Sequence, residues 1–257
     1  MKTLVEWGIV HDSYEVHPIT AGRILSDPSW KRACKLLVLP GGRDLPYCQA
    51  LNGHRNAEIL DYVRNGGCYL GICAGAYYAC SRIEFDKDNP SMSVCGNHEL
   101  GLFPGLGRGP VYSGFSYTER SGACAVPISI HPDFTFASQL QPWTKSLMNK
   151  ELYTYFNGGC EFVHQSAGGN GDAAAVANYT QLALSSQSQT VPSVAVVLSQ
   201  CGSGRALLTG VHLEVSPEDL EVLSDPLLSD VLEKLHESEH LRRTLFTALV
   251  GSLLLPQ

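Results

Sequence analysis

The hydrophobic positions of this chain fall into short runs that alternate between strand-like and helix-like spacing. Lys35 to Leu39 predicts a buried strand, because four apolar residues follow the lysine and the run stops at Pro40-Gly41-Gly42. Tyr47 to Asn65 has helical spacing and is followed by two glycines, a residue type that commonly ends helices. Cys68 to Ile72 predicts the next strand and Ala74 to Cys80 the next helix.

The second half of the chain repeats these signals in a different order. Val191 to Leu198 and Arg205 to Gly210 predict two strands, and Gly202-Ser203-Gly204 predicts the hairpin turn between them. Ser216-Pro217 predicts the start of a helix, because proline is favoured at the first helical position. Leu241 to Leu254 has the spacing of an amphipathic closing helix.

Four further segments carry weaker patterns. Tyr14 to Ile19 alternates enough to predict a short strand. Residues 84–130 are rich in glycine, proline, serine and aromatic residues, and predict β-hairpins and loops inserted beside the sheet. Ser166 to Ala183 is small and polar, and predicts a mobile surface loop. Residues 1–12 have the pattern of a helix rather than a first strand.

The alternation of strands and helices predicts an α/β fold with a doubly wound, mostly parallel sheet flanked by helices. We expect one domain over residues 1–257, with residues 84–130 as its β-rich insertion. In such sheets ligands bind at the carboxyl ends of the strands. Gly41-Gly42, Cys73 and His212 each follow a predicted strand, so three separate segments point to one edge of the sheet.

Composition limits the classes of function that remain open. The 257 residues are 44% hydrophobic and 17% charged, which is typical of a globular protein and argues against long disorder. The net charge of -7, without a basic stripe, argues against nucleic acid as a partner. No apolar run approaches the roughly 18 residues of a transmembrane helix, so we expect no membrane span.

The nine cysteines are scattered and include no CxxC pair, so we expect neither a disulfide framework nor a metal site. We expect no cofactor either. Residues 1–7 lack the apolar core and small-residue cleavage site of a signal peptide. These features favour a reducing compartment, and we expect the protein in the cytoplasm.

Cys73 lies in a Gly71-Ile72-Cys73-Ala74-Gly75 segment between a predicted strand and a predicted helix. A nucleophile on such a sharp turn needs small neighbours, and the positive end of the following helix favours a thiolate. The N–H of Ala74 would then point toward an oxyanion on a bound acyl group. The alternative is a buried structural cysteine beside a tight turn.

Two further segments carry groups that could complete such a site. His212 and Glu214 are two residues apart, so on an extended segment both side chains share one face and the carboxylate can orient the imidazole. Gly41-Gly42 can expose backbone N–H groups to an anion, or can be a plain turn. Asn157, in an Asn-Gly turn, could bind an amide or carboxylate.

Four ordered segments carry a resemblance to a known family: Leu39 to Cys48, Tyr69 to Ala79, Glu99 to Gly105 and Tyr155 to Cys160. They resemble the N-terminal domain of eukaryotic biotin–protein ligases, within the class I glutamine amidotransferase-like superfamily. The resemblance covers nearly the whole chain. It implies a flavodoxin-like α/β fold and a small-molecule amide or carboxylate substrate, with a ligase or synthetase as a possible partner.

The resemblance also assigns roles to residues of this chain. It implies Cys73 as nucleophile, His212 as base, Glu214 as orienting acid, and the N–H groups of Gly42 and Ala74 as oxyanion donors. The residues of these motifs that we expect to bind substrate are Gly41, Asp44, Tyr77, Asn157 and Gly158.

The chain departs from the superfamily pattern at three places. Glutaminases usually carry glutamine where this chain has Tyr77, which weakens the case for glutamine as substrate. Leu213 replaces the proline of their usual His-Pro-Glu segment. Their first strand has no counterpart in the pattern of residues 1–12, which is compatible with a truncated start or a sheet without that strand.

Biotin ligation is not expected from this chain alone. A ligase module needs a Gly-Arg-Gly-rich loop and a following lysine, and Gly107-Arg108-Gly109-Pro110 lacks that context. The sequence therefore predicts cleavage or transfer of a small amide through a Cys-His-Glu triad. Two alternatives remain: a non-catalytic metabolite-binding or regulatory module for a ligase, and a redox sensor built on a reactive cysteine.

Overall fold

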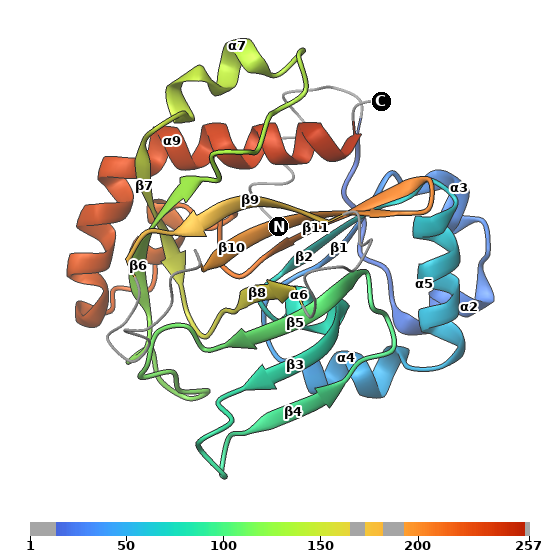
Figure 1. The fold of residues 1–257 in the computed structure, drawn as a ribbon. Coiled ribbons are helices and arrows are strands. Elements are labelled where there is room, and N and C mark those ends of the chain that lie inside the picture. The colour runs from blue at the N-terminus through green and yellow to red at the C-terminus, as the bar shows by residue number, and fades with distance from the viewer. Residues whose placement is uncertain (1–13, 165–172, 182–192, 255–257) are drawn as a thin grey trace.

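Strand β2 (Cys68–Ile72) lies inside an eleven-stranded sheet in the computed structural model, which describes residues 14–164, 173–181 and 193–254 (Figure 1). The main path of the sheet runs in the order β1-β2-β11-β10-β8-β5-β3-β4, and β9 links β10 to β6 and β7. The other strands are β1 (Leu36–Leu39), β3 (Cys80–Phe85), β4 (Val94–Asn97), β5 (Phe103–Gly109), β6 (Cys124–Ile130), β7 (Glu151–Phe156), β8 (Glu161–His164), β9 (Ala173–Tyr179), β10 (Val194–Cys201) and β11 (Gly204–Thr209).

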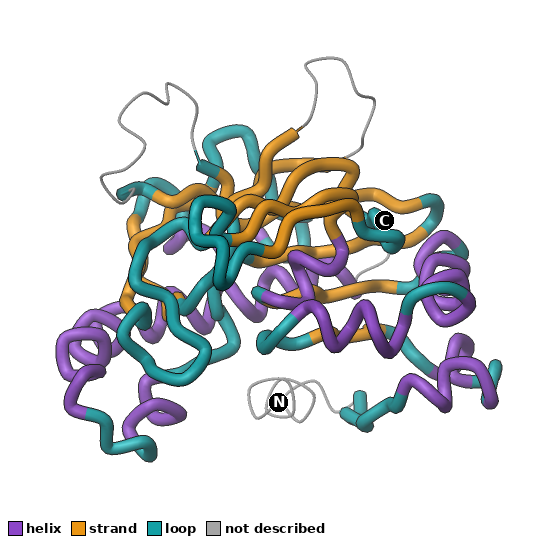
Figure 2. The backbone as a smooth tube through the Cα atoms, turned by 90° about the horizontal axis from the view of Figure 1, so that it is seen from below, coloured by secondary structure: helices purple, strands orange, loops and turns teal. Residues whose placement is uncertain are grey.

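Helices cover both faces of this sheet (Figures 1 and 2). The long helix α9 crosses one face, whereas α4, α5 and α6 lie on the other side of β1 and β2. The helices are α2 (Ala21–Ser26), α3 (Trp30–Ala33), α4 (Asp44–Leu51), α5 (His54–Arg64), α6 (Ala74–Ala79), α7 (Gln141–Thr144), α8 (Pro217–Glu221) and α9 (Ser229–Leu254), with 3-10 turns at Lys145–Leu147 and Pro226–Leu228.

The parallel strands position the candidate site. β2 pairs in parallel with β1 on one side and with β11 on the other, and β3 pairs in parallel with β5; the remaining strand pairs are antiparallel. The registers align Leu39 with Gly71 and Thr209 with Ile72, so the carboxyl ends of β1, β2 and β11 meet at one edge. The predicted α/β fold, with helices on both faces of the sheet, is confirmed.

β2 alternates between two hydrophobic cores, because successive side chains of a strand point to opposite faces. Leu70 and Ile72 join the core under α9, which includes Leu249. Tyr69 joins the core on the opposite face, together with Ile59 of α5. All five residues of β2 are buried, so the strand that carries the candidate nucleophile is fixed from both sides.

Several predicted elements match the structure closely. The strand over Cys68–Ile72 has the predicted bounds, and Gly202-Ser203-Gly204 turns β10 into β11 as an antiparallel hairpin. Helix α8 begins at Pro217, where Ser216 and Asp219 form a capping box. The closing helix is longer than predicted: α9 starts at Ser229, twelve residues before the predicted start.

Two predictions about the first third of the chain are wrong. Residues 14–19 form no strand; Thr20 instead caps α2, where its hydroxyl accepts a hydrogen bond from the N–H of Arg23. The single helix predicted over residues 47–65 is two helices, because Gly53 adopts φ +82 and separates α4 from α5. The helix predicted over residues 1–12 lies outside the described residues.

The β-rich middle of the chain belongs to the sheet rather than lying beside it. Within residues 84–130, strands β4, β5 and β6 pair with neighbours in the one sheet. The loop predicted over residues 166–183 is partly wrong, because Ala173–Tyr179 is strand β9, paired with β10; residues 165–172 lie outside the described part. The last four residues of β9, from Val176 to Tyr179, are buried, whereas Ala174 is exposed. Of the helices in the described ranges, none has the length and apolar character needed to cross a bilayer.

Candidate active site

Cys73 lies on a strained turn between β2 and α6. Its φ of 48 and ψ of -104 are unusual for a residue with a side chain, and its N–H is held by the carbonyl of Thr209 at 2.8 Å. A Cβ at Gly75 would lie 2.0 Å from the carbonyl oxygen of Leu39, and a Cβ at Gly71 would lie 2.6 Å from that of Gly75. The two flanking glycines are therefore required for this turn to pack against β1 and α6.

His212 and Glu214 form the expected pair directly after β11. The Nδ1 atom of His212 lies 2.7 Å from Oε1 of Glu214, and the two side chains are only 13% and 15% exposed. The N–H of His212 donates to the carbonyl of Tyr155 at 2.8 Å. With Nδ1 engaged by the carboxylate, the Nε2 atom of His212 is the ring nitrogen left for chemistry.

Gly41 shows that the cysteine and the histidine converge. A Cβ at this position would lie 2.7 Å from Cε1 of His212 and 3.7 Å from Cβ of Cys73. The absence of a side chain at Gly41 thus lets the imidazole approach the turn that carries Cys73. Three segments, after β1, β2 and β11, meet here, as the sequence predicts.

The pKa of His212 reflects two opposing effects. Burial alone would lower it, but the Glu214 carboxylate and the interaction with Cys73 outweigh burial and hold the pKa well above its usual value. Glu214 and Cys73 thus both favour the protonated form of the imidazole.

Gly42 and Ala74, which the sequence predicts as oxyanion donors, both line the pocket next to Cys73. Gly42 has φ +142, a conformation that favours glycine. Ala74 is the first residue of α6, and the N–H groups in the first turn of a helix lack intrahelical acceptors.

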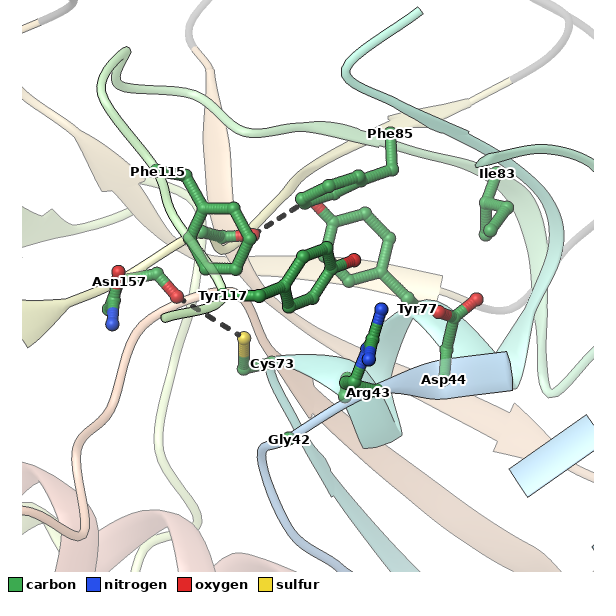
Figure 3. Close-up of a pocket in the computed structure, with 12 residues that line it drawn as sticks. Gly42, Arg43, Asp44, Cys73, Tyr77, Ile83, Phe85, Phe115, Tyr117 and Asn157 are labelled. Carbon is green, nitrogen blue, oxygen red and sulfur yellow. Dashed lines mark hydrogen bonds between the residues drawn. The ribbon is translucent and has the colours of Figure 1, made fainter. Parts of the chain in front are cut away.

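Aromatic side chains form the upper wall of this pocket, above Cys73 (Figure 3). Phe85 packs edge-on against both Tyr77 and Phe115, and Tyr117 stacks with the guanidinium of Arg43, 4.0 Å from the ring centroid. The lining residues are Gly42, Arg43, Asp44, Cys73, Ala74, Tyr77, Ile83, Phe85, Phe115, Tyr117, Asn157 and Gly158.

The residues expected to bind substrate differ in their position relative to the pocket. Tyr77 donates its hydroxyl hydrogen bond to the carbonyl of Gly158 at 3.2 Å, and burial raises the pKa of this tyrosine well above its usual value. Asn157 presents its backbone carbonyl to Sγ of Cys73 at 3.8 Å, while its side chain points away from the pocket (Figure 3). Asp44 lines the pocket, although its carboxylate points away from Cys73 (Figure 3); Gly41 packs against His212 instead.

Sequence reasoning missed several residues of this pocket. Arg43 directly follows the Gly41-Gly42 turn, and the sequence pattern predicts no role for its side chain. Phe85, Phe115 and Tyr117 come from the β-rich middle of the chain. The sequence shows that this segment is rich in aromatic residues but does not predict where their side chains lie. Only the fold brings these rings to the carboxyl edge of β2.

Comparison with known proteins places this chain in a family. The chain matches the family described as biotin-protein ligase, N terminal, over residues 2–256. The chain belongs to the biotin-protein ligase N-terminal family. Among its relatives, an uncharacterized protein of Chlamydia muridarum is 36% identical over 205 residues, which cover 79% of this chain and 70% of that protein.

A second relative is the biotin–protein ligase of Schizosaccharomyces pombe, which is 31% identical over 210 residues. The match covers 82% of this chain and 30% of the ligase, so this family member spans less than a third of the full ligase.

Solved structures support the fold assignment. A glutamine amidotransferase from Thermotoga maritima matches with a TM-score of 0.50 at 15% identity, over 86% of this chain and 79% of its own. The protein SMU.1228c matches with a TM-score of 0.54 at 12% identity, over 97% of this chain and 93% of its own. The glutamine amidotransferase-like fold expected from the sequence is thus confirmed.

Proposed function

We propose that this biotin-protein ligase N-terminal family member is a cysteine-nucleophile enzyme that cleaves or transfers the nitrogen of a small amide. The observation that carries the proposal is the convergence of Cys73, His212 and Glu214 around Gly41 at the carboxyl edge of the parallel strands. The strained turn at Cys73 and the raised pKa of His212 support it. A cysteine held for structural reasons alone would need none of these features.

The reaction follows from the order of these groups. The Cys73 thiolate attacks the amide carbon, and the oxyanion that forms accepts hydrogen bonds from the N–H groups of Gly42 and Ala74. Protonated His212 gives its proton to the nitrogen as the carbon–nitrogen bond breaks, which releases ammonia and leaves a thioester. Water then attacks the thioester while His212 takes one of its protons, and the carboxylic acid leaves as the thiol is regenerated.

The pocket wall suits an amide that also carries a carboxylate. The guanidinium of Arg43 lies in this wall, stacked on Tyr117, and a planar guanidinium binds carboxylates through paired hydrogen bonds. The hydroxyl of Tyr77 and the carbonyl groups of Asn157 and Gly158 would contact the substrate from the other side. Asp44 lines the same pocket and Gly41 packs against His212, so neither would contact the scissile amide.

This polypeptide alone would not ligate biotin. Gly107-Arg108-Gly109, the segment nearest to a ligase loop, lies inside strand β5, where it pairs with β3 and β8. The relation to the Schizosaccharomyces pombe ligase makes a ligase or synthetase the partner we propose. All nine cysteines are free, which supports a reducing compartment such as the cytoplasm as its location.

A second candidate function is a regulatory module without catalysis, and a specific observation favours it. Tyr77 and Phe85 fill the pocket wall, and Tyr77 stands where glutaminases usually carry glutamine. Such a site could bind a metabolite without converting it, and could regulate a ligase in response. The two functions differ in whether an acyl group ever becomes bound to Cys73.

The deciding experiment incubates the full chain with a panel of small amides, with and without a carboxylate, and follows ammonia release and intact mass. The proposal predicts ammonia release by the wild type and a mass increase on Cys73 for a slowly hydrolysed substrate. The Cys73→Ser variant should lose both, and the matched Cys95→Ser variant, at an exposed cysteine, should keep both. Binding of an amide or carboxylate with neither signal would favour the regulatory module.

A further inference from the structure

Asp44, Cys48 and His98 form a cluster of potential metal ligands beside the Cys73 pocket. Asp44 and Cys48 lie one turn apart on α4, so they share a face of that helix. His98 follows β4 and reaches the same place from the other side. One ligand atom from each residue lies within 4.8 Å of the other two.

The spacing of the three atoms also fits a shared ion. Nε2 of His98 lies 3.7 Å from Oδ2 of Asp44, beyond hydrogen-bonding range but within ion-pair distance for a protonated histidine, and makes a long hydrogen bond of 3.8 Å with Sγ of Cys48. Ligands at zinc bond lengths of about 2.0–2.3 Å in a tetrahedron are separated by about 3.3–3.8 Å. The two distances therefore match edges of a tetrahedral coordination shell.

An unsatisfied polar group points to a ligand independently. Within the described residues, Oδ2 of Asp44 and Nδ1 of His98 are buried without a hydrogen-bond partner, and the side chains are only 12% and 8% exposed. A buried carboxylate oxygen without a donor is costly unless a cation meets it. Oδ2 is also the atom that faces Nε2 of His98, so a cation between them would contact both.

The cluster is held in place by its surroundings. The N–H of His98 donates to the carbonyl of Ser81 at 3.0 Å. The next residue, Glu99, accepts hydrogen bonds from the N–H of Gly53 at 2.7 Å and from Nδ2 of Asn56 at 3.1 Å. These contacts tie the histidine to the junction of α4 and α5, so binding an ion would require little rearrangement.

We propose that Asp44, Cys48 and His98 bind a divalent transition-metal ion of the zinc class, with a fourth position for water. Thiolate, imidazole and carboxylate are ligands that Zn²⁺ accepts together. On binding, the S–H bond of the Cys48 thiol breaks, a sulfur–metal bond forms, and one proton per ion passes to solvent.

The proposed ion would stabilise the wall of the pocket rather than act on substrate. α4 begins at Asp44, two residues after Gly42, so an ion bound through Asp44 and Cys48 would fix the turn that precedes this helix. In Figure 3 the Asp44 carboxylate points away from Cys73. The proposal stands on this geometry alone and does not depend on the proposed amide chemistry.

Cobalt binding tests the proposal with a readout that does not require activity. The full chain, freed of metal by a chelator and kept reduced, is titrated with Co²⁺ and then with Zn²⁺. We expect one Co²⁺ per chain, a thiolate-to-cobalt absorption band in the near ultraviolet, and loss of that band on adding Zn²⁺. Calorimetry in buffers of different ionisation enthalpy should count one proton released per ion.

Variants of the proposed ligands and of two other cysteines test which residues bind the ion. Cys48→Ser should remove the band, and His98→Gln should weaken Co²⁺ binding by more than the roughly 10- to 100-fold that loss of an outer-shell partner costs. Cys73→Ser should keep the band, which separates this cluster from the Cys73–His212 pair, and Cys95→Ser controls for the exposed thiol near His98.

Several outcomes would overturn the proposal: no band in the wild type, a band that survives in Cys48→Ser, or a band lost in Cys73→Ser. Circular dichroism establishes whether each variant folds. If Cys48→Ser does not fold, His98→Gln decides, and unchanged Co²⁺ affinity in that variant would refute the site.

Discussion

Arg242, buried at 1% exposure on helix α9, donates a hydrogen bond to the carbonyl of Leu213, the residue between His212 and Glu214. The same guanidinium pairs with Glu239 one turn earlier on the helix, at 2.7 Å. The long helix therefore holds the backbone of the histidine–glutamate segment, although neither Arg242 nor α9 reaches the pocket. Arg242 is a positioning residue for the candidate base.

Replacing Arg242 tests this role. Arg242→Met leaves the Leu213 carbonyl buried without a donor, which should lower the free energy of unfolding by about 1–3 kcal/mol. It should also slow iodoacetamide labelling of Cys73, because His212 loses its fixed position. Arg243→Met, at an exposed neighbour on the same helix, is the matched control and should change neither quantity. Labelling of Cys73 unchanged in folded Arg242→Met would show that the arginine is structural only.

Gly41 gives a second test of the convergence at the site. In Gly41→Ala, the new Cβ would lie 2.7 Å from Cε1 of His212, so the ring must shift from its place beside Cys73. We predict that the pH dependence of Cys73 labelling becomes that of a cysteine without a histidine partner. Gly96→Ala is the control, since a Cβ there meets nothing within 4 Å. A normal labelling profile in Gly41→Ala would contradict the placement of His212.

The raised pKa of His212 predicts how stability depends on pH. Below about pH 6.5, the ordinary histidine value, folded and unfolded states both carry the proton and the stabilisation by Glu214 is complete. As the pH rises through the higher folded pKa, the unfolded chain releases its proton first and the stabilisation is lost. Comparing Cys73→Ser with Cys73→Ser/Glu214→Gln between pH 5 and 9 isolates this effect from the thiol.

We expect the difference in unfolding free energy between these two variants to be largest near pH 5–6 and to shrink toward pH 9. Chemical denaturation at each pH measures it. A difference that stays constant, or grows with pH, would mean that Glu214 does not stabilise a protonated His212.

Replacing Arg43 tests whether the substrate carries a carboxylate. If its guanidinium binds a substrate carboxylate, Arg43→Met should lower kcat/KM by about 10- to 100-fold for an amide that carries one, mainly through KM. An amide without a carboxylate should be turned over at nearly the wild-type rate. Arg82→Met, at an exposed arginine of β3, is the control. Equal losses on both kinds of amide would remove Arg43 from substrate recognition.

The sequence was sufficient to predict the parts of the site that lie at strand ends. Cys73 and His212 each follow a continuous apolar run, and parallel strands bring such positions to one edge. The tight turn at Cys73 could also be predicted locally, because neither Gly71 nor Gly75 has room for a side chain. This explains why the proposed nucleophile and base lie together as predicted.

The remaining features depend on contacts between distant segments, which local patterns do not encode. His98 lies 50 residues from Cys48, so their approach had no spacing signal, and no metal site was expected. The sequence around Arg242 gives no signal that this charged residue is buried, yet it is buried on α9. Similarly, the alanine-rich segment of β9 resembled a loop, because small side chains packed against β10 carry no amphipathic pattern.

The central claim is that His212 activates Cys73. The most direct test is peptide-resolved iodoacetamide labelling of the full chain at pH 7, in the wild type and in His212→Ala, with exposed Cys95 as internal reference. The account predicts that Cys73 labels faster than Cys95 despite its burial, and that His212→Ala reduces this ratio at least about tenfold, a change of about 1.4 kcal/mol. A Cys73 no more reactive than Cys95, or a ratio that His212→Ala leaves unchanged, would contradict it.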